Sequence, residues 1–131
     1  MKIAVDTNVL VRAVVRDDPK QSEIAAKTLT NAELLIVGTS CLCEFAWVLR
    51  RVYKFTPATT AAAIRELLEA ANVEANRPAV EAGLAMLDAE GDFADGVIAH
   101  EGEWLGAETF VSFDKRAVEM LKAQGVAAKL L

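Results

Sequence analysis

Acidic residues stand where apolar segments of this sequence give way to helical ones. Asp6 directly follows one apolar segment, and Asp114 follows another after only two residues. Glu44 and Asp95 lie in the first turns of two expected helices. If a folded sheet brought these carboxylates together they would repel one another, and a cation would be needed to keep them all ionised.

The chemistry that such a cluster would support follows from its donor atoms. A site built from carboxylates, without histidine or cysteine, suits Mg²⁺ or Mn²⁺ rather than zinc. Ions of this kind bind phosphate oxygens, lower the pKa of an attacking water and stabilise the leaving oxygen during phosphodiester cleavage. The acidic residues therefore indicate metal-assisted phosphodiester chemistry, provided that they converge.

Each acidic residue also has an ordinary structural explanation. Asp6, Asp92 and Asp114 all occupy positions where an aspartate commonly caps the N-terminus of a helix. Glu44 could be a solvated first-turn carboxylate that the helix dipole favours. Asp95 is harder to explain in this way, because it precedes an apolar face at residues 97–99 that we expect to pack inward. Only the combination of residues favours a shared site.

The elements that must position these residues alternate between strand and helix. Apolar runs predict strands at 2–5, 34–37, 108–113 and 126–131, with a short extended piece at 72–74. Helical spacing, caps and proline starts predict helices at 7–16, 19–30, 40–53, 57–71, 79–90, 92–106 and 114–124. Thr7 or Asn8 is suited to cap the first helix, and Asp18 and Thr56, each followed by a proline, are suited to cap two later ones. This alternation predicts an α/β fold with a parallel sheet between helices, whose strand C-termini share one edge where ligands bind.

Composition narrows the class of protein. The chain has 131 residues, which predicts a single domain over residues 1–131, and no apolar run approaches the roughly 18 residues of a membrane span. The start of the chain lacks the pattern of a secretory signal, so we expect a cytoplasmic protein. The net charge of −5 argues against a broad basic surface for nucleic acid.

Cysteine and histidine offer little alternative chemistry. Cys41 and Cys43 are two residues apart on an expected helix, point in different directions and predict neither a disulfide nor a zinc site. His100 is the only histidine, which leaves no two-histidine mechanism and favours a packing or surface position. The roles of these three residues stay open.

The acidic residues and their neighbours fall in the order typical of PIN-domain ribonucleases. The matching pieces are VDTN with Asp6, Thr7 and Asn8, then Glu44, then DFADGVIA with Asp95, and finally VSFD with Ser112 and Asp114. The chain resembles most closely the VapC-type toxins of bacterial and archaeal toxin–antitoxin pairs. No single one of these four motifs is specific for the family. All four in this order, on an α/β pattern, make a specific match.

The resemblance implies a PIN-like three-layer sandwich with a central parallel sheet of about four to five strands flanked by helices. It also implies a divalent-metal-dependent endoribonuclease using Mg²⁺ or Mn²⁺, with catalysis and metal binding assigned to Asp6, Glu44, Asp95 and Asp114. Supporting hydrogen bonds would come from Thr7, Asn8, Ser112 and Asp92. The implied partners are an RNA substrate, a cognate antitoxin and a second copy in a homodimer, with no membrane.

Two other interpretations of the sequence compete with the PIN-domain ribonuclease. A phosphatase of the haloacid-dehalogenase type also has an aspartate after its first strand, but it needs a second aspartate two residues later, where this chain has Asn8. A catalytically silent PIN-like module that binds RNA or protein is the second alternative, and the intact acidic residues argue against it.

Clusters of basic residues could bind phosphate groups locally although the net charge of the chain is negative. Candidates for phosphate contacts are Arg12, Arg16, Arg50, Arg51, Lys54, Lys115 and Arg116, although a solvated helix end explains the cluster of Arg50, Arg51 and Lys54 equally well. The aromatic residues Trp47, Tyr53, Phe55 and Trp104 could line a groove for a partner helix, but residues of this kind at helical spacing are more often core.

Overall fold

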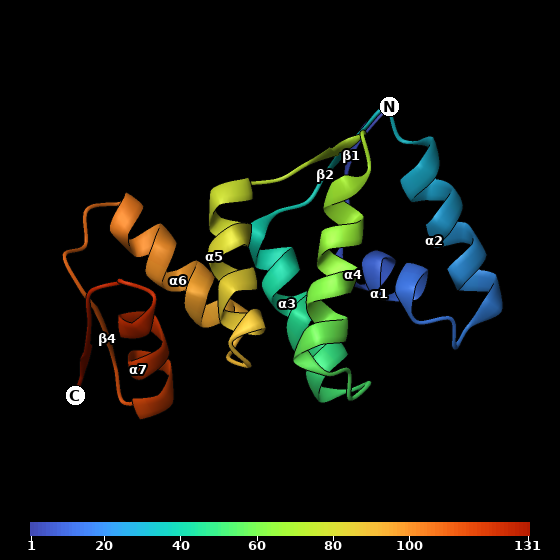
Figure 1. Ribbon diagram of the computed structural model, residues 1–131. Coiled ribbons are helices and arrows are strands. Elements are labelled where there is room, and N and C mark those ends of the chain that lie inside the picture. The colour runs from blue at the N-terminus through green and yellow to red at the C-terminus, as the bar shows by residue number, and fades with distance from the viewer. The chain divides into compact units, whose positions relative to one another are not determined.

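One or two helices lie between each strand and the next in the computed structural model, which describes residues 1–131 (Figure 1). The elements are β1 (Lys2–Ala4), α1 (Thr7–Val14), α2 (Pro19–Asn31), β2 (Leu34–Ile36), α3 (Thr39–Arg51), α4 (Pro57–Glu69), β3 (Val73–Glu74), α5 (Arg77–Asp88), α6 (Phe93–Trp104), β4 (Phe110–Ser112), α7 (Lys115–Ala123) and β5 (Ala128–Leu130). They form two compact units, Met1–Asn76 and Arg77–Leu131. The single-domain expectation stays a prediction.

The predicted α/β class is confirmed, and all strand pairs are parallel. The five strands do not pair as one sheet. The first unit holds a three-stranded sheet in the order β1-β2-β3, and the second holds a two-stranded sheet of β4 and β5. Both sheets are consistent with the expected sandwich, and every crossover between paired strands contains at least one helix.

The first unit has a core of apolar residues from its sheet and its helices. Leu35 on β2 is almost fully buried, as are Leu42 and Leu49 on α3 and Ile64 on α4. The leucines of α3 are seven residues apart, so they face the same side of the helix. Helix α3 packs on α1 and α4, and its start follows β2 after two residues.

Helix starts in the first unit follow the predicted capping chemistry, with one correction. Asp18 caps α2 and Thr56 caps α4, each followed by a proline. Helix α1 is capped by Asp6, which confirms the ordinary structural explanation of that residue, and not by Thr7 or Asn8, because the chain turns helical immediately after β1.

The second unit is built on close packing of α5 against α6. A Cβ on Gly83 would collide with the Phe93 ring, and a Cβ on Gly96 would collide with the backbone of Ala82. A further cluster joins Met86, Ala99 and Leu121, which are buried, to the flanking hydrophobic residues Phe110, Met120, Val126 and Ala128. This cluster ties α6 and α7 to the β4–β5 sheet.

Several apolar side chains lie at the surface against expectation. Trp47 and Trp104 are 56% and 80% exposed, so the core interpretation is wrong for both, and Tyr53 and Phe55 are only partly buried. Ile98 is also exposed, although residues 97–99 were expected to face inward. Successive helical residues turn by about 100°, so three in a row cannot share one face.

No helix combines the length and the apolarity that a membrane crossing requires.

Candidate functional site

Asp6 occupies the junction between β1 and α1. Its side chain is exposed, and its Oδ1 accepts a hydrogen bond from the backbone N–H of Thr7 at 2.8 Å. Because β1 and β2 are parallel with Ala4 opposite Ile36, the chain leaves both strands at the same edge of the sheet. The residues that follow β2 therefore begin near Asp6.

Cys41, in the first turn of α3, joins the two segments that leave this edge. The Thr7 hydroxyl donates to Cys41 Sγ at 3.8 Å, and the thiol donates to the carbonyl oxygen of Val5 at 3.7 Å. Thr7 is 5% exposed, so its hydroxyl needs a partner inside the protein. The thiol supplies that partner and connects the start of α1 to α3.

Glu44 lies one turn beyond Cys41 on the same face of α3. Burial raises the pKa of the Cys41 thiol, the hydrogen bond from Thr7 opposes this, and the negative charges of Asp6 and Glu44 raise it further. Both carboxylates therefore act on the same thiol. The first unit thus brings Asp6, Thr7 and Glu44 around Cys41, while Asn8 is exposed on α1.

In the second unit, Asp92 and Asp114 cap helices α6 and α7. The side chain of Asp92 accepts from the backbone N–H of Asp95 at 3.1 Å, and that of Asp114 accepts from Ala117 N–H at 3.1 Å. Ser112 Oγ accepts from the backbone N–H of Asp114 at 2.9 Å, which orients the turn after β4. The capping explanation is therefore correct for both aspartates, and a cap can also bind a metal through its free carboxylate oxygen.

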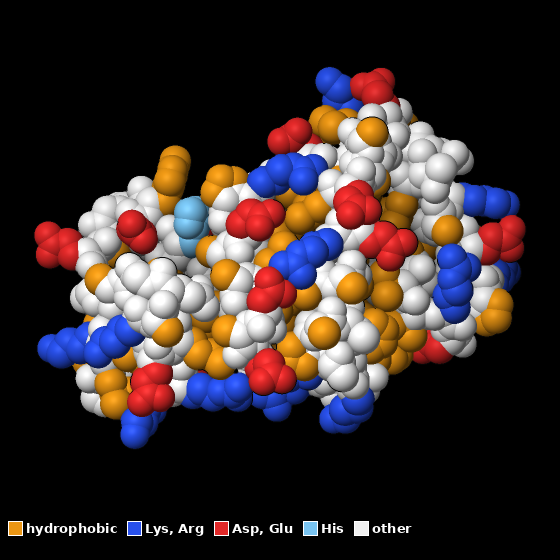
Figure 2. Space-filling model, viewed as in Figure 1, with side chains coloured by type: hydrophobic (Ala, Val, Ile, Leu, Met, Phe, Trp, Pro, Cys, Tyr) orange, Lys and Arg blue, Asp and Glu red, His pale blue; other side chains and the backbone are white.

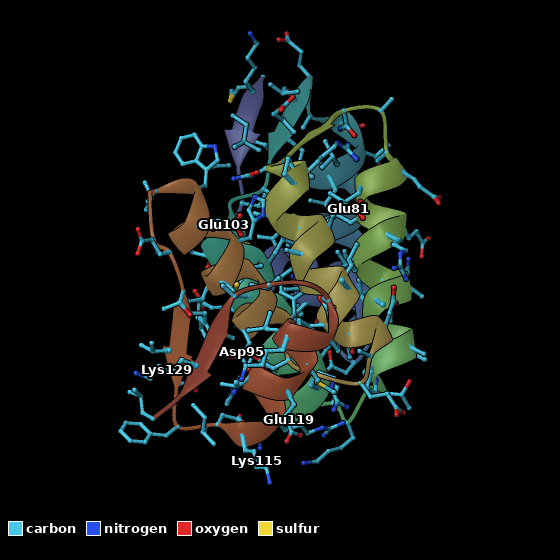
Figure 3. All side chains as sticks on the ribbon, turned by 60° about the vertical axis from the view of Figure 1, so that its left-hand side comes forward. Glu81, Asp95, Glu103, Lys115, Glu119 and Lys129 are labelled. Atoms are coloured by element: carbon cyan, nitrogen blue, oxygen red, sulfur yellow. The ribbon has the colours of Figure 1, made fainter.

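Asp95 lies in the first turn of α6 and is partly buried (Figure 3). Partial burial raises its pKa to about 6, and the negative charges of Asp92 and Asp114 add to the rise. The negative charges of Asp92 and Asp114 thus act on the Asp95 carboxyl group. This excess of negative charge is what a bound divalent ion would relieve.

The family model for the PIN domain matches residues 3–122. The chain belongs to the PIN domain family. This match covers all four predicted carboxylates and most of both units. No curated protein matches the chain.

The acidic residues of this PIN domain fall into two sets. Asp6 and Glu44 belong to the first unit, and Asp92, Asp95 and Asp114 belong to the second. No group of three or more acidic, histidine or cysteine side chains already forms a metal cage. The donors nevertheless fit a hard cation, because they are carboxylates and because the raised pKa of Cys41 keeps its thiol from offering the anionic sulfur that zinc prefers.

Several cations proposed for phosphate binding are engaged within the PIN domain. Arg12 donates to Gln21, Asp17 and the Tyr53 hydroxyl, which locks the α1–α2 turn against the end of α3. Arg50 donates to the Phe55 carbonyl oxygen. These two arginines stabilise turns of the first unit, and the exposed cations that remain are better placed to meet a ligand.

Arg116 is engaged in the second unit, where its guanidinium donates to the carbonyl oxygen of Glu90 at 3.0 Å. Lys115 has only a long ion pair with Glu119 at 4.0 Å, and both side chains are largely exposed. Exposed ion pairs of this kind contribute little to the stability of the folded protein. Lys115 is therefore free to turn toward a phosphate.

Two further residues escaped prediction. The sequence alone assigns no role to Cys41, although its spacing of three residues from Glu44 places the two on one helix face. It gives no sign of a role for Phe113 either, because an apolar residue at the end of a strand ordinarily indicates core. Its exposure is visible only in the folded chain.

Proposed function

We propose that this PIN domain is a divalent-metal-dependent endoribonuclease and that it acts as the VapC-like toxin of a toxin–antitoxin pair. The observation that carries the proposal is the rise in the pKa of Asp95, caused by burial and by Asp92 and Asp114, in a chain of a nuclease-type family. A site that accumulates negative charge and exposes it to solvent is suited to bind a cation.

The carboxylates Asp6, Glu44, Asp95 and Asp114 would hold Mg²⁺ or Mn²⁺ in this proposal. Such an ion supplies an activated water and neutralises charge on the scissile phosphate. Ser112 Oγ accepts a hydrogen bond from the backbone N–H of Asp114. The backbone N–H of Thr7 donates to the Asp6 carboxylate, and the Thr7 hydroxyl donates to the Cys41 thiol. These contacts pre-orient two of the ligands before any substrate arrives.

Exposed cations would bind the RNA backbone around the carboxylates. Lys115 follows Asp114 directly, and Arg16, Arg51 and Lys54 are exposed in the first unit. Phosphate contacts of this kind position RNA without reading its sequence. The acidic total charge of the PIN domain is compatible with this arrangement because a bound ion neutralises part of the carboxylate charge.

The toxin role rests on the likeness of the motifs to VapC-type toxins, and it implies a cognate antitoxin and a homodimer. Expression of the chain alone should arrest growth, and co-expression of a small DNA-binding protein encoded next to it should restore growth. An isolated gene whose expression is harmless would contradict the toxin role. The nuclease activity would then still be tested separately, by the cleavage assay.

The nuclease proposal is tested by incubating the purified protein with structured RNA in Mg²⁺, in Mn²⁺ and in EDTA. Cleavage should require the metal, and Asp95→Asn and Asp114→Asn should each lower the rate by about 100-fold or more, because ligand loss costs at least as much as loss of a supporting hydrogen bond. Asparagine is also a good helix cap, so Asp114→Asn removes charge while preserving the start of α7.

Asp18→Asn is the matched control, since Asp18 caps α2 by the same interaction that Asp114 makes at α7. This variant should cleave at the parent rate. Equal cleavage by Asp95→Asn and the parent would show that the carboxylates are not the site. Metal-independent binding of RNA without any cleavage would instead support the silent binding module.

A further inference from the structure

Phe113 is 83% exposed, the most exposed aromatic residue of the second unit. It lies in the turn between β4 and α7, directly between Ser112 and Asp114. A phenylalanine so open to water gains almost nothing from the hydrophobic effect in the folded chain. Its position must therefore be explained by something other than core packing.

The surroundings of Phe113 combine apolar surface with positive charge. Val111, two residues earlier on β4, is half exposed and pairs in register with Lys129 on β5. Lys115 follows two residues later, and both lysines are exposed (Figure 3). Figure 2 shows hydrophobic and Lys or Arg side chains next to one another over the β4, α7 and β5 part of the surface, with an Asp or Glu side chain among them.

We propose that Phe113 is a stacking platform for an unpaired base of single-stranded RNA. This inference rests on the proposed nuclease function and names a residue that holds its substrate. Phe113 directly precedes Asp114 in the turn after β4, so RNA stacked on the ring would lie beside the turn that carries this carboxylate.

The charge around Phe113 favours RNA over a protein partner. Lys115 and Lys129 can bind the phosphates on either side of a stacked base, which is how single-stranded nucleic acid is commonly held. The other strongly exposed aromatic residue of this unit, Trp104, offers a contrast. It follows Glu103 directly on α6 and has no lysine or arginine among the four residues on either side of it.

Stacking on Phe113 also requires that the base be unpaired. A ring at the tip of a turn can reach the face of a base that is free to rotate outward, but not a base inside a duplex. The Ser112 hydrogen bond to the Asp114 N–H holds this turn in one conformation, so little ordering is needed when RNA binds.

The test measures RNA binding and cleavage by variants of the full chain. A fluorescein-labelled, 12-nucleotide single-stranded RNA of mixed sequence is titrated in EDTA, where cleavage is prevented, and KM and kcat are then measured in Mg²⁺. Phe113→Ala and Phe113→Leu should weaken binding by about five-fold to 150-fold, as loss of one stacked base does. Phe113→Trp should bind at least as well as the parent, and Trp104→Ala is the exposed-aromatic control that should change nothing.

The variants should raise KM more than they lower kcat, because stacking holds the substrate and transition state alike. The same RNA annealed to its complement should bind no better to the parent than to Phe113→Ala. Parent-like binding by Phe113→Leu would overturn the inference, since leucine keeps the apolar volume and removes the aromatic face. A changed oligomeric state of Phe113→Ala with unchanged RNA affinity would also overturn it and assign the ring to a protein contact.

Failure of the stacking inference and failure of the proposed function give different results. If the parent cleaves RNA and Phe113→Ala cleaves it with the same KM, the nuclease stands and the platform is wrong. If the parent binds single-stranded RNA through Phe113 but never cleaves it, the platform stands and the nuclease is wrong. Absence of binding to single-stranded RNA by the parent overturns the platform.

Discussion

The Thr7 hydroxyl donates a hydrogen bond to the Cys41 thiol at 3.8 Å, across 34 residues of sequence. This contact joins the first turn of α1 to the first turn of α3, the two helices that carry Asp6 and Glu44. The thiol in turn donates to Val5 at the end of β1. Cys41 thereby links strand, turn and helix at the edge where the first pair of carboxylates lies.

We predict that Cys41→Ala lowers the free energy of unfolding by about 1 kcal/mol, because the buried Thr7 hydroxyl loses its partner and a small cavity forms. Cys41→Ser should recover part of the loss, since its hydroxyl can both donate and accept. Urea unfolding of the three proteins measures the difference. Ser40→Ala, a change at an exposed neighbour on α3, is the control. Identical stability of Cys41→Ala and the parent would show that the link is unimportant.

Asp95 should make stability depend on pH. Its pKa in the folded protein is raised to about 6, so the folded state holds this proton more tightly than the unfolded chain does. The resulting stabilisation is complete below the unfolded pKa of about 3.9 and is lost as pH rises through about 6. Without metal, Asp95→Asn should therefore match the parent near pH 4 and exceed it by about 1 kcal/mol at pH 7.5, a value reduced for screening by solvent.

Thermal melts in EDTA between pH 4 and pH 8 test this prediction. Added Mg²⁺ should raise the melting temperature of the parent and narrow its gap to Asp95→Asn, because an ion that binds only the folded state stabilises it. Glu66→Gln, at an exposed position on α4, is the control for the chemical change of an acid to its amide. A gap for Asp95→Asn that is the same at pH 4 and pH 7.5 would contradict the assigned origin of the pKa.

Gly96 and Gly102 should respond in opposite ways to the same substitution. A Cβ at Gly96 would meet the Ala82 backbone and lie 2.8 Å from Met86 Cγ, so Gly96→Ala should cost about 1–3 kcal/mol and lower the melting temperature. At Gly102, on the same helix, the nearest atom would be Ala107 Cβ at 3.8 Å. Gly102→Ala should therefore stabilise the protein by up to about 1 kcal/mol through helix propensity.

Differential scanning calorimetry of both alanine variants measures the contrast. A neutral Gly96→Ala would mean that α5 and α6 separate easily and that their close approach is not required. Because α6 carries Asp95, the Gly96 variant should also be assayed for RNA cleavage at a temperature where it stays folded.

The sequence by itself determined the local structure of this PIN domain. Residue types and their neighbours predict helix starts at Asp18, Thr56, Asp92 and Asp114, and each of these side chains accepts a backbone N–H three residues later. Capping involves residues within one turn, so it can be deduced from a short segment. The same locality made the alternation of strand and helix predictable and allowed the four-part motif to indicate the family.

Tertiary structure alone decided which of these residues act on one another. The division of the strands into sets of three and two, the exposure of Ile98 and Phe113, and the contact between Thr7 and Cys41 all depend on which remote segments pack together. The pKa of Asp95 depends on Asp114, which reaches it only through the packing of the second unit. Burial and electrostatic coupling are set by distance in space, and a sequence pattern specifies distance only within the turn or strand to which it belongs.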